Sequence, residues 1–215
     1  MLGVQTKLPL IVIGGGGHAS VLVDILRKQR REILAVVSPD DIYCRGVFSN
    51  LLHLEKDSDV LKYRPQDIRL VNGIGMVPKS SLRQSINEFF LDAGYEFETV
   101  ISDDAYVSPY ASVQLGAQVF PHAILQPGVV VGEHSIINTG ALIEHDCDIG
   151  TYSHIAPRAT LCGEVSVASE AFIGAGATVL PSLKISQNAV IGASCHITED
   201  VKAGCTVYPA RTITK

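Results

Sequence analysis

Residues 137–172, divided every six residues, read INTGAL, IEHDCD, IGTYSH, IAPRAT, LCGEVS and VASEAF. Each of these hexads begins with a branched aliphatic residue and has Ala, Cys, Ser or Val at its fifth position. The same register runs from Ile101 to Tyr208, where seventeen of eighteen first positions are Val, Ile or Leu and only Ala203 departs. A period of six fits neither an α-helix, with 3.6 residues per turn, nor plain strand alternation over this length.

The hexads instead predict a coil of short parallel strands joined by tight turns. The branched aliphatic residue points inward, the small residue fills the corner, and Gly or Asn at the turns supplies backbone freedom. Three hexads complete one triangular coil, so eighteen hexads give six coils. We therefore expect residues 101–215 to form an all-β left-handed parallel β-helix. Cys147 and Cys195 fall on the small fifth position and are interpreted as buried structural thiols.

Residues 1–100 show the pattern of a separate α/β domain. Strand, glycine loop, helix and strand follow one another, which is half of a Rossmann fold. The elements expected from the pattern are strands at Leu8–Ile13, Ile33–Val37 and Leu70–Asn72, a helix through Val21–Leu26 and a helix at Lys79–Ala93. The predicted fold class is therefore an N-terminal α/β half-Rossmann domain followed by the β-helix.

The loop after the first predicted strand contains a partial dinucleotide fingerprint. Gly14, Gly16 and Ala19 satisfy G-x-G-x-x-A, and Asp40 follows about twenty residues on. No second nucleotide-binding half follows, so the match is weak support for NAD. Bare glycine backbone at a helix N-terminus suits phosphate oxygens, and a mononucleotide with two phosphates fits better than a dinucleotide. The alternative is a tight turn that binds no ligand.

Composition excludes several classes of function. The formal net charge is −5 and no basic run occurs, which argues against a nucleic-acid partner. The apolar run Leu8–Ile13 is too short for a signal sequence or a membrane span, so we expect a cytoplasmic protein without membrane insertion. The five cysteines lack CxxC spacing, and no His, Cys and carboxylate cluster demands a metal ion, so none is expected.

Two motifs in this order resemble a known family. They are GGGGHAS at residues 14–20, and NTGALIEHDC at residues 138–147 followed by SH at 153–154. The chain resembles, over essentially its whole length, the sialic-acid O-acetyltransferase and bacillosamine-pathway N-acetyltransferase family of hexapeptide acyltransferases. The resemblance implies a homotrimer with acetyl-CoA in the groove between the β-helices of neighbouring subunits. Each β-helix, residues 101–215, is called the prism below. It also implies that a nucleotide-linked sugar reaches from the first domain of one subunit to the prism of another.

The resemblance assigns roles to residues of the predicted prism. His145 matches the general base, and Asp146 matches the carboxylate that raises the basicity of that histidine. His154 matches a contact to acetyl-CoA. Ala175 and Ala193 fall where family members contact the cofactor through backbone atoms.

The resemblance also assigns a substrate site to the first domain. Gly16, Gly17 and His18 match the nucleotide-sugar loop, and Gly75 matches a substrate-contacting glycine after a strand. His18 is open to three roles: touching a phosphate, polarising the substrate or capping the helix. Asp40 is assigned to the substrate as the acidic residue near the second strand, although Ser38 and Pro39 intervene. Near the other end of the chain, residues 206–210 read TVYPA where relatives usually have a glycine before V/I-P-A, so Tyr208 is a departure from the family pattern.

The chemistry explains why a histidine is needed. Acetyl transfer to an amine requires removal of a proton, and histidine titrates near neutral pH. Asp146 can fix the tautomer of His145 and favour the imidazolium. No Ser or Cys nucleophile is required, so direct attack is expected. Gly163 lies one predicted coil after His145, and its backbone N–H is our candidate for stabilising the oxyanion.

The leading function is acetyl-CoA-dependent N-acetylation of the 4-amino group of a nucleotide-linked 4-amino-4,6-dideoxy sugar, as in bacterial glycan biosynthesis. UDP is the first choice of nucleotide, with GDP and dTDP as alternatives. The runner-up is O-acetylation of a sialic-acid-like sugar by the same groups. A non-catalytic nucleotide-sugar sensor is the alternative from another class, and the single nucleotide half disfavours NAD-dependent chemistry.

Overall fold

A computed structural model describes residues 7–210 of the chain. The chain divides into two compact units, Met1–Val100 and Ile101–Lys215. The ends of the two expected domains, residues 1–6 and 211–215, lie outside the described residues. Each unit is treated below by itself.

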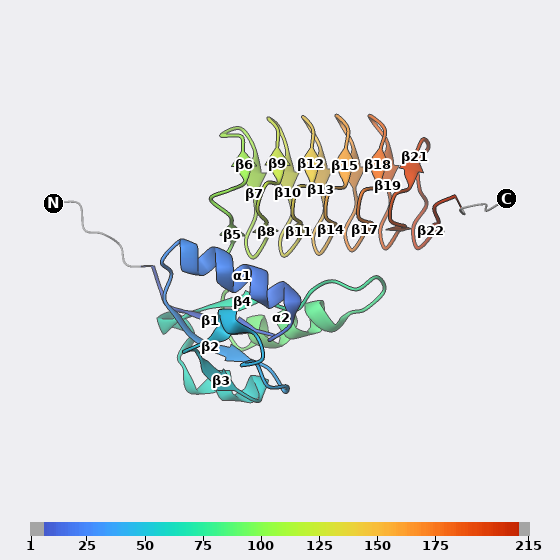
Figure 1. Cartoon of the computed structure of the whole chain (residues 1–215). Coiled ribbons are helices and arrows are strands. Elements are labelled where there is room, and N and C mark those ends of the chain that lie inside the picture. The colour runs from blue at the N-terminus through green and yellow to red at the C-terminus, as the bar shows by residue number, and fades with distance from the viewer. Residues whose placement is uncertain (1–6, 211–215) are drawn as a thin grey trace. The chain divides into compact units, whose positions relative to one another are not determined.

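The first unit is a four-stranded parallel sheet, sheet A, with strand order β3-β2-β1-β4 (Figure 1). Its strands are β1 (Leu10–Ile13), β2 (Ile33–Val37), β3 (Leu52–Leu54) and β4 (Arg69–Asn72). Its helices are α1 (Gly17–Lys28), α2 (Leu82–Asp92) and the short 3-10 helices η1 (Gly46–Phe48), η2 (Asp57–Lys62) and η3 (Pro65–Asp67). The half-Rossmann prediction is confirmed. The sequence pattern missed β3, which is only three residues long.

Helix α1 forms because its apolar residues recur at helical spacing. Ala19, Leu22, Val23 and Leu26 are all buried, which is the i, i+3, i+4, i+7 pattern of one helix face. Arg27 and Lys28 occupy the last turn, where cations interact favourably with the helix dipole. The helix begins directly after the glycine loop, so its first N–H groups lie at that loop.

In sheet A, β2 and β3 are added on one side of β1, and β4 is added on the other side. The strand order therefore switches between β1 and β4. In open α/β sheets, ligands bind outside the carboxyl ends of the strands at such a point. The loops that follow β1 and β4 approach closely there, because a Cβ on Gly73 would lie 2.7 Å from the Cβ of Ala19 and 2.9 Å from the Ile13 carbonyl oxygen. Gly14, with φ of +103°, also requires glycine. The sheet therefore places two glycine loops together at its switch point.

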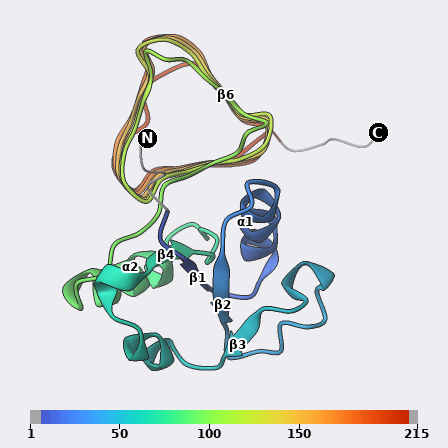
Figure 2. The ribbon, with the colours of Figure 1, turned by 90° about the vertical axis from the view of Figure 1, so that its left-hand side faces the viewer.

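The second unit consists of eighteen two-residue strands in three parallel sheets (Figures 1 and 2). Sheet B holds β5 (Val100–Ile101), β8 (Gln118–Val119), β11 (Ile136–Ile137), β14 (His154–Ile155), β17 (Phe172–Ile173), β20 (Val190–Ile191) and β22 (Thr206–Val207). Sheet C holds β6 (Tyr106–Val107), β9 (Ile124–Leu125), β12 (Leu142–Ile143), β15 (Thr160–Leu161), β18 (Thr178–Val179) and β21 (His196–Ile197). Sheet D holds β7 (Ser112–Val113), β10 (Val130–Val131), β13 (Asp148–Ile149), β16 (Ser166–Val167) and β19 (Lys184–Ile185).

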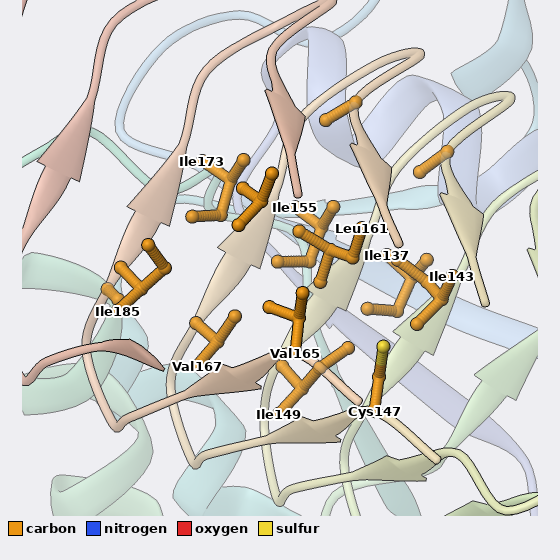
Figure 3. Packing of buried hydrophobic residues seen from close by; sticks show 14 of the residues in the cluster. Ile137, Ile143, Cys147, Ile149, Ile155, Leu161, Val165, Val167, Ile173 and Ile185 are labelled. Carbon is orange, nitrogen blue, oxygen red and sulfur yellow. The ribbon is translucent and has the colours of Figure 1, made fainter. Parts of the chain in front are cut away.

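Seen end on, these coils superimpose as a triangle (Figure 2). The first positions of the hexads fill its interior in layers, as Ile137, Ile143, Ile149 and Ile155 show (Figure 3). Burying each such side chain stabilises the fold by about 1.5–3 kcal/mol. Cys147 belongs to the same cluster and is buried, as predicted. The left-handed parallel β-helix is confirmed.

The last coil departs from the predicted register. Strand partners in earlier coils are eighteen residues apart, but Val190 pairs with Thr206 and Ile185 with Val201, sixteen residues apart. Val201 therefore takes a buried position, whereas Ala203 is exposed. The prediction of an unbroken repeat to Tyr208 is wrong for its last hexad. Valine buries more apolar surface than alanine, which favours the shortened coil over the regular one.

Candidate active site

His145 and Asp146 lie on the turn between β12 of sheet C and β13 of sheet D. His145 Nδ1 is 2.9 Å from Asp146 Oδ2. An ionised carboxylate only accepts hydrogen bonds, so Nδ1 carries the proton and the neutral ring presents Nε2 as an acceptor. The hydrogen bond that Nδ1–H donates to Asp146 raises the pKa of His145 above its ordinary value, and the charges of Glu144 and Glu164 act in the same direction. The pair thus forms an exposed base oriented by a carboxylate.

Two glycines make room for this pair. A Cβ on Gly163 would lie 2.6 Å from both Cε1 and Nε2 of His145, so the imidazole sits directly over the backbone of Gly163. A Cβ on Gly128 would collide with Asp146 Oδ1. Gly163 was expected from the sequence, whereas Gly128 was not. The signal was present, because Gly128 precedes Asp146 by one coil of eighteen residues, as His145 precedes Gly163.

Gly163 also offers a hydrogen-bond donor beside the base. Its carbonyl accepts from the Ser182 N–H at 2.9 Å. Its own N–H makes no hydrogen bond within residues 7–210. A backbone N–H without a partner, in the glycine whose backbone the imidazole of His145 covers, is suited to a developing negative charge.

Replacing Asp146 by asparagine is expected to lower the pKa of His145. The variant removes the carboxylate that favours the imidazolium, and asparagine tolerates the left-handed backbone of this position, where φ is 60°. Histidine titration by NMR would measure the shift. Glu164→Gln is the matched control and should produce a smaller decrease, because Glu164 acts on His145 without the hydrogen bond. An unchanged His145 pKa in the Asp146 variant would contradict the assigned cause.

His154 lies on β14 and is held by a different set of neighbours. Its Nε2 is 3.0 Å from Asn138 Nδ2, and Asn138 Oδ1 accepts from the Thr139 N–H at 2.8 Å. Because the amide nitrogen only donates, Nε2 of His154 accepts and the ring is neutral with its proton on Nδ1. The Phe172 ring packs edge-on at 5.0 Å between centroids. The predicted contact of His154 with acetyl-CoA stays a prediction.

Ala175 and Ala193 are exposed and stacked one coil apart, and the Ala175 carbonyl accepts from the Ser194 N–H. Both lie on turns that lead from sheet B to sheet C. His145 and Gly163 lie on turns that lead from sheet C to sheet D. The structure therefore brings His145, Asp146 and Gly163 together, and it places the predicted cofactor alanines on another edge of the prism.

In the first unit, the predicted substrate glycines surround the start of α1. Gly16 is the N-cap residue of the helix, and a Cβ on Gly16 or Gly17 would meet nothing within 4 Å. Their backbone is thus open, with the positive end of the helix dipole behind it. A Cβ on Gly75 would lie 3.4 Å from the Cβ of His18. Four predicted substrate residues therefore meet at the switch point of sheet A.

Asp40 follows the end of β2 and is exposed. Its N–H donates to Ser38 Oγ at 3.3 Å, and a Cβ on Gly15 would lie 2.8 Å from the Cβ of Ser38. The intervening Ser38 thus packs against the glycine loop, and the substrate role of Asp40 stays a prediction. Tyr208 is 79% exposed.

No cluster of three or more His, Cys, Asp or Glu side chains suited to a metal ion occurs among the described residues. In the same part of the chain, no helix has the length and apolar character needed to cross a membrane.

Comparison with known proteins gives a consistent class. No protein-family model matches the sequence, and no curated protein matches it. A histidine-to-alanine mutant of GDP-perosamine N-acetyltransferase from Caulobacter crescentus, solved with CoA and GDP-perosamine, is 30% identical with a TM-score of 0.82, over 96% of this chain and 93% of that one. The acetyltransferase domain of PglB from Neisseria gonorrhoeae, solved with acetyl coenzyme A, is 26% identical with a TM-score of 0.84, over 96% and 100%. WeeI from Acinetobacter baumannii, at 21% identity and a TM-score of 0.80 over 93% and 96%, shares the fold.

The fold and these matches define an acyltransferase built on a left-handed β-helix. The chain belongs to the family of hexapeptide-repeat sugar N-acetyltransferases, since its identity to one member reaches 30% over nearly the full length of both chains. The sialic-acid O-acetyltransferase half of the resemblance has no specific counterpart among these neighbours.

Proposed function

We propose that this protein transfers an acetyl group from acetyl-CoA to the 4-amino group of a nucleotide-linked 4-amino-4,6-dideoxy sugar. The observation that carries the proposal is the His145–Asp146 pair, seated over the open backbone of Gly163. Neighbours solved with CoA and GDP-perosamine support the cosubstrate and the class of acceptor. UDP is the first choice of nucleotide from the sequence, and the GDP-linked ligand of these neighbours supports GDP.

In the proposed reaction, the neutral amine of the sugar attacks the thioester carbon of acetyl-CoA. Nε2 of His145 takes the proton from the amine as the new C–N bond forms, and the Gly163 N–H donates to the oxyanion. Collapse of the tetrahedral intermediate breaks the C–S bond, and the proton held by His145 leaves with the CoA thiol. The products are the acetamido sugar and free CoA. Since only neutral imidazole accepts a proton, activity rises with pH through the raised pKa of His145.

The glycine loop at the start of α1 is the proposed site for the nucleotide diphosphate. Gly16 and Gly17 offer open backbone N–H groups at a helix N-terminus, which suits phosphate oxygens. His18 and Gly75 border the same loop, and Asp40 follows the neighbouring strand.

The distribution of residues around the prism supports a homotrimer. His145 lies on the edge between sheets C and D, whereas Ala175 and Ala193 lie on the edge between sheets B and C. If Ala175, Ala193 and His154 bind acetyl-CoA, the two alanines that contact it and the base His145 lie on different edges of the prism within one chain. In a closed trimer, the edge of one prism faces a different edge of its neighbour, which completes the site.

The test is a free-thiol assay for CoA release, with acetyl-CoA and UDP-, GDP- and dTDP-linked 4-amino-4,6-dideoxy sugars. Turnover with one of these sugars is the expected result, and the best substrate names the nucleotide. CoA release only with a sialic-acid-like acceptor would move the assignment to O-acetylation. Binding of nucleotide sugar, without binding or turnover of acetyl-CoA, would leave a sensor and contradict the proposal.

A further inference from the structure

Helix α2 buries polar side chains on the face where an apolar stripe is expected. Its buried residues are Arg83, Asn87 and Phe90, at i, i+4 and i+7. Arg83 is 3% exposed and Asn87 is fully buried. Buried charged and amide groups are costly unless they are bonded, so such a face calls for a specific reason.

The bonds of Arg83 run to the backbone of the loop after β4. Its Nη1 donates to the carbonyl oxygen of Asn72 at 3.0 Å and to that of Ile74 at 2.6 Å. A guanidinium in this position fixes two alternate carbonyls on the same side of the segment. Hydrogen bonds from a charged donor are stronger than those between neutral groups.

Asn72 completes the same network from the strand end. Its Nδ2 donates to Asn87 Oδ1 at 2.7 Å and to the Arg83 carbonyl oxygen at 3.1 Å. Its Oδ1 accepts from the Ile74 N–H at 2.9 Å. Both the N–H and the C=O of Ile74 are therefore held by buried side chains, directly before Gly75.

This fixed segment borders the candidate substrate loop. Gly73 packs against the start of α1, and its N–H donates to the Ile13 carbonyl oxygen at 2.7 Å. Gly75 contacts His18, with a Cβ position 3.4 Å from the Cβ of the histidine. The network thus sets where Gly75 stands relative to the N-terminus of α1.

We propose that Arg83 is a positioning residue for the nucleotide-sugar site, which holds the Gly73–Gly75 loop in the conformation that receives the substrate. The inference rests on the proposed function for the identity of the ligand. Arg83 acts through Asn72 and Ile74. Its buried positive charge also favours an anionic ligand at this end of sheet A. The anionic ligand that Arg83 favours is the diphosphate of a nucleotide sugar. Acetyl-CoA binding does not depend on Arg83.

The experiment compares wild type, Arg83→Met and Arg31→Met. Arg31 is a matched control, because its side chain is also largely buried and bonded, to Glu98 and to the Leu8 carbonyl, at the opposite ends of the strands. We expect Arg83→Met to raise the KM for the nucleotide sugar by about tenfold, with the KM for acetyl-CoA unchanged. Arg31→Met should change neither KM, although both variants lose thermal stability. Equal KM values for the sugar in wild type and Arg83→Met would overturn the proposal.

Hydrogen exchange in the ligand-free protein separates this inference from the proposed function. The Ile74 amide should exchange about tenfold faster in Arg83→Met, and at the wild-type rate in Arg31→Met. If Arg83→Met does not fold, Arg83→Lys retains the charge with fewer donors and should give an intermediate KM and exchange rate. Wild-type exchange at Ile74 in the Arg83 variant would overturn the inference, even if the enzyme acetylates no sugar tested. Inactive wild type with fast exchange in the variant would overturn only the proposed function.

Discussion

Replacement of His145 by alanine is expected to lower kcat for acetyl transfer by about 10²- to 10⁴-fold, the contribution typical of a positioned general base. His145 presents Nε2 as an acceptor because Nδ1 is engaged by Asp146 at 2.9 Å. Alanine removes the acceptor and leaves the core of the prism untouched, since the imidazole is exposed. Steady-state CoA release measures the effect. The KM for acetyl-CoA should change little if His145 acts on the acceptor amine.

His196→Ala is the control for this prediction. His196 is also an exposed histidine of the prism, on β21, and it lies in a regular strand conformation that alanine adopts without strain. Its variant should keep the wild-type kcat. Comparable losses in both variants would indicate a general effect on the fold, and full activity of His145→Ala would remove His145 from the reaction.

The sequence predicted the prism because its core is a repeated local pattern. Seventeen of the eighteen first positions carry a branched aliphatic residue at a fixed interval, so the register could be read directly until the last coil. In the last coil, either Val201 or Ala203 can take the inward position, and the structure buries Val201. Strand β3 was missed because three residues, Leu52–Leu54, carry too little alternation to stand out.

The site was predicted less completely than the fold. His145, Asp146 and Gly163 could be grouped because one coil is eighteen residues, and the structure confirms that the ring of His145 lies over Gly163. The network around Arg83 could not be found in this way. It joins a strand end to a helix eleven residues later through backbone carbonyls, which leave no mark on the sequence pattern. Arg83 is a polar residue on the buried face of α2, which indicates such a network. This can be recognised only once the structure shows which face of α2 is buried.

Replacement of Gly163 by alanine, which adds a single methyl group, is expected to reduce kcat by about 10²-fold. The added Cβ would lie 2.6 Å from Cε1 and Nε2 of His145, closer than carbon atoms approach, so the imidazole must move. Displacing a catalytic group by about 1 Å can cost on the order of 10² in rate. Alanine keeps the backbone N–H of residue 163, so the loss should come from the base rather than from the oxyanion donor. CoA release under saturating substrates measures it.

The double variant His145→Ala with Gly163→Ala decides the origin of that loss. If the methyl group acts by displacing the imidazole, it has nothing to displace once the ring is removed. The double variant should then be no slower than His145→Ala alone, which is strong non-additivity between contacting residues. A further 10²-fold loss in the double variant would show that the methyl group blocks the substrate or distorts the Gly163 N–H. The same comparison tests the geometry itself, because wild-type activity in Gly163→Ala would mean that the imidazole does not lie over this glycine during the reaction.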